Sequence, residues 1–447
     1  IGGMVVAEGI LTSTGGMTSH AAVVARGMGT PCVSGAKDLG IVGKLATVSG
    51  VKFKEGDWMT IDGTTGAIYQ GQLPLVAAKI GKELETFLGW CDTIREGSVR
   101  GSLKGFGVRT NADTPADAKR AFDFGAQGIG LCRTEHMFFD KDKLIHFRAM
   151  IVADGEAQRK EALKKILPLQ KKDFVGIFKA MEGRPVTIRL LDPPLHEFVP
   201  HTKAETEELA KHIGVKVKDL QPKIDRLHEA NPMLGHRGCR LAVTYPEIYD
   251  TQVEAIMLAA VDCAKKKIPV NPEIMIPIVC DPKELEILRA RTKKIVDGTL
   301  AKAGVSMKVL IGTMIEVPRA AILADEVAKH ADFFSYGTND LTQMTYAFSR
   351  DDAGSFLPAY LQQEILPSNP TETIDEAGVG FLMKHASDYG RKTKADLKLG
   401  ICGEQGGDPA TIDFCYRIGL NYVSCSPFRV PIARLAGARA VIRNTKK

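Results

Sequence analysis

Residues suited to acid–base and anion chemistry stand directly after short apolar runs in the C-terminal three quarters of the chain. They are Arg133, Glu135, Arg189, Asp192, Glu316, Asn339, Asp340, Cys402, Glu404 and Ser426. Guanidinium groups match the geometry of phosphate and carboxylate. A pair of carboxylates such as Glu316 and Asp340 offers the hard oxygen ligands that Mg²⁺ prefers. The set predicts a site for a small anion beside Mg²⁺.

Each of these charged side chains also has a purely structural interpretation. Loop residues are often polar, so one polar strand end carries little weight, and buried charges are commonly paired with each other. The structural alternatives are ion pairs of Glu316 and Asp340 with basic neighbours, and of Arg133 and Arg189 with Glu135 and Asp192. The pairs of the two arginines are compatible with ligand binding.

Cys402 lies in the glycine-rich stretch GICGEQGG, residues 400–407. Glycine lets backbone and ligand approach closely, and a thiol there can donate or accept a proton at carbon. The sequence has no CxxC pair, which argues against a disulfide framework or a zinc site and favours a reducing, intracellular compartment. Most other cysteines are predicted to be small buried apolar residues: Cys132, Cys239, Cys263, Cys280, Cys415 and Cys425.

His20 is set on a tight turn near the start of the chain. Two glycines, Gly15 and Gly16, precede it, Thr18 and Ser19 place hydroxyls next to it, and a helix of small apolar residues is predicted to follow. An incidental histidine in a capped helix is the alternative. The residues in the rest of the chain have to decide between a functional and an incidental His20.

The elements that must position these residues are eight short apolar runs, most of them followed by a plausible helix. The runs are 106–113, 128–135, 185–192, 273–279, 309–318, 333–340, 399–404 and 422–427. Strands buried on both faces that alternate with helices predict an α/β fold with a closed (β/α)₈ TIM barrel, although an open doubly wound sheet can also hold eight strands. In such a barrel the catalytic residues lie at the C-terminal ends of the strands. Residues 193–240 are predicted to form a mostly helical insertion.

The first part of the chain has a different pattern. Residues 56–71 predict a hairpin with a Gly-Thr-Thr-Gly turn, and residues 75–96 predict an amphipathic connecting helix. Its apolar positions are Val76, Ile80, Leu84, Phe87, Leu88, Cys91 and Ile94. We therefore predict a small N-terminal domain over 1–73, a helical linker over 74–100 and the barrel over 101–447.

The bulk composition narrows the function classes. The 447 residues carry a formal net charge of +6 with basic and acidic residues interspersed, so a nucleic-acid partner is not expected. No run approaches the length of a membrane span, and no signal peptide is recognisable. Because the first residue is Ile1, the sequence suggests a fragment or processed form.

Six motifs, in order, resemble the pyruvate, phosphate dikinase family of phosphoenolpyruvate-utilising enzymes. They occupy residues 15–35, 128–138, 187–198, 314–321, 335–352 and 400–409. Phosphoenolpyruvate synthases, and phosphotransferase-system enzymes that pass phosphate to a protein, are related phosphoenolpyruvate-utilising enzymes. They are the alternative assignments. Met17, where those relatives usually carry arginine, and the CGEQGGDP stretch at 402–409 favour the dikinases.

The resemblance implies that His20 is the nucleophile that carries a phosphoryl group. The glycine turn exposes the imidazole, and free N–H groups at the start of the following helix can stabilise the anion. Thr18 matches a regulatory phosphorylation site, where added negative charge would repel the incoming phosphoryl group. The histidine domain is expected to swivel between two sites, with the segment 75–100 as the hinge.

The resemblance also assigns roles at the barrel rim. Mg²⁺, the implied cofactor, is expected on Glu316 and Asp340, and Cys402 is expected to be the proton donor. The remaining substrate-binding residues are Arg133, Arg189, Gly337, Thr338 and Asn339. It further implies pyruvate and phosphoenolpyruvate as substrates, an ATP-binding region absent from this chain, a homodimer formed through the barrel, and a cytoplasmic or organellar location (glycosome, peroxisome or plastid).

Overall fold

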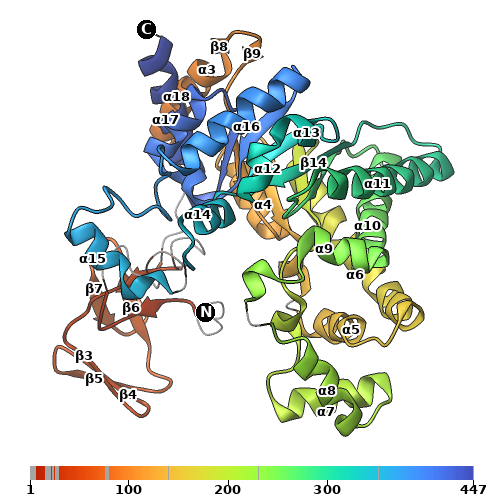
Figure 1. Cartoon of the computed structure of the whole chain (residues 1–447). Coiled ribbons are helices and arrows are strands. Elements are labelled where there is room, and N and C mark those ends of the chain that lie inside the picture. Colours follow the sequence, from red (N-terminus) through yellow and green to blue (C-terminus); the bar gives the residue numbers. More distant parts are fainter. Residues whose placement is uncertain are drawn as a thin grey trace. The chain divides into compact units, whose positions relative to one another are not determined.

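The computed structural model describes residues 7–15, 22, 25, 30–75, 80–138, 140–229, 231–350 and 352–445. The chain divides into two compact units, residues 1–85 and 86–447 (Figure 1). His20 and Thr18 lie outside the described residues. None of the helices in the described ranges is long and apolar enough to cross a membrane.

The described residues of the first unit form three small sheets. The strands are β1 (Ile10–Leu11), β2 (Cys32–Val33), β3 (Leu39–Val42), β4 (Leu45–Val48), β5 (Val51–Lys54), β6 (Met59–Asp62) and β7 (Ala67–Gln70). Strands β6 and β7 form the predicted antiparallel hairpin. In its turn, Asp62 accepts hydrogen bonds from the Thr64 amide at 2.9 Å and the Thr65 hydroxyl at 2.7 Å. The prediction of a hairpin over 56–71 is confirmed.

The second unit is built on a closed barrel of eight parallel strands. They are β10 (Gly107–Asn111), β11 (Ile129–Arg133), β12 (Pro185–Arg189), β13 (Asn271–Ile276), β14 (Leu310–Ile315), β15 (Phe333–Tyr336), β16 (Lys398–Ile401) and β17 (Tyr422–Cys425). Strand β17 pairs with β10 and closes the sheet, with Val423 beside Val108. Every strand overlaps one of the predicted runs, and β13 and β16 begin one or two residues before theirs. Because the sheet is closed, the barrel is confirmed and the open-sheet alternative is wrong.

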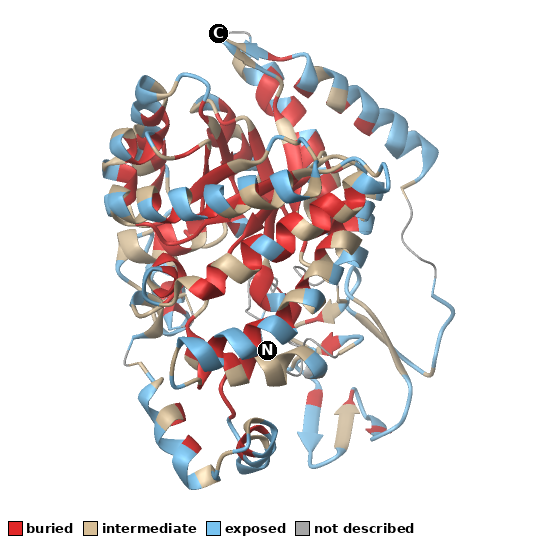
Figure 2. Ribbon diagram, turned by 90° about the vertical axis from the view of Figure 1, so that its right-hand side faces the viewer, coloured by how far each residue is buried: buried red, intermediate tan, exposed pale blue. Residues whose placement is uncertain are grey.

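Helices cover the outer face of the barrel, so the strands are buried on both sides, as the dense apolar runs predicted. Figure 2 shows the buried strands at the centre of this unit and the exposed outer faces of its helices. The helices along the chain are α4 (Pro115–Asp123), α5 (Lys141–Ile151), α6 (Glu156–Met181), α10 (Pro246–Lys265), α11 (Pro282–Ala303), α12 (Pro318–Ile322), α13 (Ala324–Ala328), α14 (Thr338–Tyr346), α15 (Leu357–Gln362), α16 (Val379–Thr393), α17 (Pro409–Arg417) and α18 (Val430–Thr445).

Side-chain caps mark where several of these helices begin. Thr114 caps α4, Asp281 caps α11 and Asp408 caps α17, each followed directly by proline. A capping oxygen satisfies a free N–H of the first turn, and proline lacks the N–H that would be left unpaired there. These residues therefore fix the points at which α4, α11 and α17 begin after the loops that follow β10, β13 and β16.

The predicted insertion lies between β12 and β13. It holds α7 (Lys203–Ile213) and α8 (Val217–Arg226), and the chain returns to the barrel through α9 (Gly238–Thr244). Helix α7 begins with a capping box, in which Thr202 and Glu205 each satisfy a backbone N–H of the other. The prediction of a largely helical insertion is confirmed.

The connecting helix differs from the prediction. Helix α3 spans Lys82–Glu96, so it begins after Gly81 and not at residue 75. Glycine disfavours the helix, whereas glutamates in the first turn favour it. Leu88 and Cys91 are buried, but Phe87 is exposed, so the predicted apolar stripe is only partly covered. A short hairpin of β8 (Val99–Arg100) and β9 (Leu103–Lys104) then leads into the barrel.

None of the nine cysteines, all of which lie in the described ranges, forms a disulfide. Those predicted to be small apolar residues are buried, apart from Cys280, which is only half-buried. Its thiol lies 3.7 Å from a carboxylate oxygen of Glu284, because it follows strand β13 and precedes the cap of α11.

Candidate active site

The predicted site residues meet at the C-terminal ends of the barrel strands. Arg133 and Arg189 are the last residues of β11 and β12 and are neighbours in the sheet register. Glu316 directly follows β14, Asp340 lies in the first turn of α14 after β15, and Cys402 directly follows β16. The rim predicted from the sequence therefore exists.

Arg189 is buried between two acids. Its Nη1 atom is 2.6 Å from Asp192 Oδ2, and its Nη2 atom contacts Glu135. Burial lowers the pKa of Arg189, but the charges of Asp192 and Glu135 outweigh burial and raise it well above its usual value. The structural alternative is thus confirmed for Arg189, whose guanidinium is held as a fixed cation.

Arg133 has a different partner from the predicted one. Its backbone N–H donates to Asp113 Oδ1 at 2.6 Å, and its guanidinium lies 3.9 Å from Asp113 Oδ2. The same Oδ2 atom is 2.7 Å from His136 Nδ1. The predicted ion pair of Arg133 with Glu135 or Asp192 is therefore wrong, because Arg189 takes both of those acids.

Glu316 carries a buried carboxylate that is only half satisfied. Its Oε1 atom accepts the Ile278 N–H at 2.6 Å, and its Oε2 atom is buried with no hydrogen-bond partner among the described residues. Burial and the nearby charges of Asp340 and Asp192 raise the pKa of Glu316 well above its usual value. A buried carboxylate in this state requires either a proton or a cation.

Asp340 is paired with an arginine that the sequence analysis missed. Arg237 Nη1 lies 3.1 Å from Asp340 Oδ1, so the structural alternative is confirmed for Asp340. Burial nevertheless raises the pKa of Asp340. Glu316 has no such ion pair among the described residues, so the alternative that Glu316 simply pairs with a basic neighbour is wrong.

The charges of this cluster do not balance. Four carboxylates, those of Glu135, Asp192, Glu316 and Asp340, face two guanidinium groups, those of Arg189 and Arg237. When all are ionised, two negative charges are left over, which equals the charge of one divalent cation. The described residues contain no group of three or more His, Cys, Asp or Glu side chains placed to hold a metal. Mg²⁺ commonly uses only one or two carboxylates and fills its other positions with water and substrate oxygens, so Glu316 and Asp340 fit it.

The residues before Asp340 form a tight wall beside this cluster. A Cβ atom on Gly337 would lie 2.5 Å from Glu316 Oε2, so only glycine fits there. The Thr338 hydroxyl donates to Gln405 Oε1 at 2.7 Å, and Asn339 Oδ1 accepts the Glu404 N–H at 3.0 Å. These two bonds tie the start of α14 to the segment that follows Cys402.

Cys402 is buried in this wall. Its N–H donates to the Tyr336 carbonyl at 3.1 Å, and its own carbonyl accepts from Asn111 Nδ2 at 3.0 Å. Burial raises the pKa of the thiol to about 11, an effect that the Ser335 hydroxyl only partly offsets. The thiol therefore keeps its proton at neutral pH.

The structure adds rim residues of two kinds that were not predicted from the sequence. Asn111 and Asp113 lie at the end of the first apolar run. A search for polar residues at the end of every run would therefore have found them. Arg237, the partner of Asp340, and Arg350, the partner of Glu404, lie outside any strand end, so the strand-end pattern does not mark them. The one signal for Arg237 is the pair of flanking glycines, Gly235 and Gly238.

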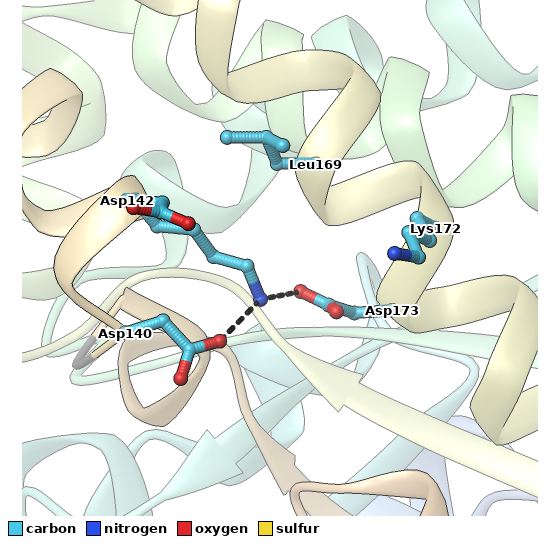
Figure 3. Close-up of a pocket in the computed structure, with 6 residues that line it drawn as sticks. Asp140, Asp142, Leu169, Lys172 and Asp173 are labelled. Carbon is cyan, nitrogen blue, oxygen red and sulfur yellow. Dashed lines mark hydrogen bonds and ion pairs between the residues drawn. The ribbon is translucent and has the colours of Figure 1, made fainter.

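A separate hollow of about 410 Å³ lies between α5 and α6 (Figure 3). Lys143 is one of its lining residues and forms ion pairs with Asp140 at 3.1 Å and Asp173 at 2.7 Å. The ammonium group of Lys143 is thus already neutralised by two carboxylates of the same hollow.

Comparison with known proteins assigns both parts of the chain to described families. Residues 96–442 match the family described as "PEP-utilising enzyme, PEP-binding domain", where PEP is phosphoenolpyruvate. The chain belongs to the PEP-utilising enzymes. Residues 1–66 of this PEP-utilising enzyme match a second family, described as "PEP-utilising enzyme, mobile domain".

Several relatives of this PEP-utilising enzyme carry the name pyruvate, phosphate dikinase. The proteins of Clostridium symbiosum and Rhizobium meliloti are each 53% identical to it over 99% of this chain, which corresponds to 50% and 49% of their own lengths. A chloroplastic protein of Flaveria pringlei is 52% identical over 99% of this chain and 46% of its own. The chain thus spans about half the length of these relatives, and the predicted resemblance is confirmed.

Proposed function

We propose that the chain performs the phosphoenolpyruvate–pyruvate half of a pyruvate, phosphate dikinase reaction. The observation that carries this proposal is that the thiol of Cys402, two arginines and the carboxylate pair of Glu316 and Asp340 all lie at the same rim of the barrel. Phosphoenolpyruvate has an anionic phosphoryl group, a carboxylate and a carbon that must gain a proton, and each finds a partner of matching chemistry there.

Arg133 and Arg189 bind the anionic groups in this proposal. Their neighbouring register positions on β11 and β12 support the proposal that both guanidinium groups serve one ligand. Fixed cations stabilise negative charge in the transition state without reorganising, and Arg189 is fixed by its two acids. Both residues neutralise the phosphoryl group as it passes between the enolate oxygen and the carrier histidine.

Glu316 and Asp340 hold Mg²⁺ in this proposal. When bound, Mg²⁺ supplies positive charge that stabilises the enolate form of pyruvate. Asn339 and the backbone of Gly337 and Thr338 orient the substrate next to this pair. The support is the half-satisfied Glu316 carboxylate and the surplus of two negative charges described above.

Cys402 handles the proton. As phosphoenolpyruvate becomes pyruvate, the thiol gives its proton to the methylene carbon and is left as thiolate, and in the reverse direction the thiolate takes a methyl proton back. Proton donation requires a group that is protonated at working pH, and the raised pKa of Cys402 meets that requirement.

His20 accepts the phosphoryl group on its imidazole, and Thr18 is the matching regulatory site. Support comes from the glycine turn and from the match of residues 1–66 to the mobile-domain family. The whole reaction is ATP + phosphate + pyruvate to AMP + diphosphate + phosphoenolpyruvate, with the nucleotide step in a part of the protein beyond these residues. We further propose that the barrel mediates a homodimer.

The decisive experiment is labelling with [³²P]phosphoenolpyruvate in the presence of Mg²⁺. Acid-labile label is expected on the wild-type chain and absent from His20→Asn, whereas His330→Asn, a matched histidine change in the barrel unit, should retain it. A chase with pyruvate should remove the label. Equal labelling of His20→Asn would contradict the carrier role, and label that only a second protein removes would favour a phosphotransferase.

A further inference from the structure

Arg237 joins two acids that belong to different strands of the barrel. Its side chain is 6% exposed, and its Nη2 atom is 2.6 Å from Asp192 Oδ2. Its Nε atom donates to Asp192 Oδ1 at 3.2 Å, and its Nη1 atom to Asp340 Oδ1 at 3.1 Å. One guanidinium therefore holds the acid that follows β12 and the acid that follows β15.

The backbone next to Arg237 is fixed by a close approach. Gly238 has a φ of +56° and donates its N–H to the Asp192 carbonyl at 3.0 Å. A Cβ atom on Gly238 would lie 2.2 Å from Ile278 Cγ2 and 2.9 Å from Asp192 Oδ1. Ile278 in turn holds Glu316 through its N–H. The end of the insertion therefore packs directly against Asp192, which pairs with Arg237, and against Ile278, which binds Glu316. This packing fixes the backbone position of Arg237.

The two contacts of Arg237 are not equivalent. Asp192 is fully buried and engages Arg237 through both carboxylate oxygens, whereas Asp340 is held through one. A buried arginine that lost the contact to Asp340 would therefore still be paired. Asp340, in contrast, belongs to a cluster in which four carboxylates face two guanidinium groups, and the Oε2 atom of Glu316 in that cluster has no hydrogen-bond partner among the described residues.

We propose that Arg237 is a positioning residue that occupies Asp340 in the cation-free protein and competes there with a divalent cation. When the cation binds, it neutralises the Asp340 carboxylate in place of Arg237, and Arg237 stays paired with Asp192. This inference rests on the proposed function, in which Glu316 and Asp340 hold the metal. Its consequence is that the guanidinium weakens cation binding while it keeps Asp340 in place.

The test measures Mn²⁺ binding to the substrate-free chain by electron paramagnetic resonance. Removing a buried positive charge next to the cation is expected to tighten Mn²⁺ binding by about tenfold in Arg237→Gln and Arg237→Met. Arg237→Lys keeps the charge and is expected to stay near the wild type. Arg240→Gln is the matched control, because among the described residues the Arg240 guanidinium donates to backbone carbonyls of its own segment, those of Leu234 and Gly235.

The direction of the effect separates this role from a purely structural one. Loss of a structural support would weaken Mn²⁺ binding, so unchanged or weaker binding in folded Arg237→Gln would overturn the inference. If Arg237→Gln does not fold, Arg237→Met decides by the same criterion. Glu316→Gln separates the two proposals: wild-type Mn²⁺ binding there would overturn the metal site itself, whereas loss there without tightening at Arg237 would overturn only the inference.

Discussion

Arg350 holds both carboxylate oxygens of Glu404, at 2.8 and 2.7 Å, and Glu404 is the acid closest in sequence to Cys402. Burial raises the pKa of Glu404, but Arg350 outweighs it and the net pKa is lowered. The carboxylate is therefore charged and paired at neutral pH, while the neighbouring thiol keeps its proton. Of these two groups, Cys402 is the one able to donate a proton.

Cys402→Ala is expected to abolish exchange of the pyruvate methyl protons with solvent deuterium, measured by NMR. Binding of phosphoenolpyruvate, measured by calorimetry, should stay within about twofold, because a neutral thiol contributes little to holding an anion. Arg133→Ala should instead weaken binding by about 30-fold, since a charge-assisted hydrogen bond is lost.

Cys415→Ala is the control for the thiol, because Cys415 is also buried but lies in α17. Exchange at the wild-type rate in Cys402→Ala would assign the proton to another group. Glu404 acting through a water would then be the next residue to test.

Changes in the carboxylate pair should affect the Mg²⁺ dependence of phosphoenolpyruvate binding. Glu316→Ala and Asp340→Ala are each expected to lower the affinity for phosphoenolpyruvate in the presence of Mg²⁺ by at least about tenfold. Even residues that only support a metal ligand cause a loss of this size when they are changed. Circular dichroism should remain unchanged because both residues lie at the rim. Asp297→Asn, an exposed change on α11, is the control, and full Mg²⁺ dependence in both rim variants would place the metal elsewhere.

Gly403→Ala tests the contact between the Cys402 loop and α14. A Cβ atom there would lie 1.9 Å from the Thr338 hydroxyl oxygen, so one of the two loops must move. We expect at least about 1 kcal/mol of destabilisation, typical of overpacking, together with weaker phosphoenolpyruvate binding. Denaturant unfolding and calorimetry measure the two effects.

Gly298→Ala is the matched glycine change, since a Cβ atom on this helical residue meets nothing within 4 Å. It should stabilise the protein by up to about 1 kcal/mol through helix propensity. Wild-type stability and binding in Gly403→Ala would show that the close approach of these loops is not required.

Glu273 predicts an acid-dependent loss of stability. It lies inside the barrel, 2.9 Å from Arg109 and in contact with Lys398. Burial raises its pKa, but these two cations outweigh burial and lower it to about 2. A carboxylate whose folded pKa lies below its unfolded value of about 4.3 stabilises the fold above that value, and the contribution is lost as the pH falls toward 2.

Glu273→Gln should lower the free energy of unfolding at pH 7 by about 3 kcal/mol, the typical result of removing one partner of a buried ion pair. The difference from the wild type should shrink as the pH falls below about 4. Urea unfolding at several pH values measures both effects. Glu326→Gln on the surface of α13 should change stability by less than about 0.5 kcal/mol, and a pH-independent difference for Glu273→Gln would contradict the assignment.

The sequence alone determined the eight barrel strands and most of the rim. Buried parallel strands are dense apolar runs, and the residue after each run faces the rim, so Glu316, Asp340 and Cys402 were identifiable from local pattern. The hairpin at 56–71 was equally local, because its turn and its pairing lie within 16 residues.

Only the tertiary structure decided which charges pair. Arg133 and Arg189 lie side by side in the register, so Glu135 reaches across to Arg189 and leaves Arg133 to Asp113 from the preceding strand. Arg237 reaches Asp340 across 103 residues of sequence because the insertion returns to the rim at a glycine turn. Strand positions follow from side-chain periodicity within a few residues, whereas the partner of a buried charge depends on which chain segments barrel closure brings together.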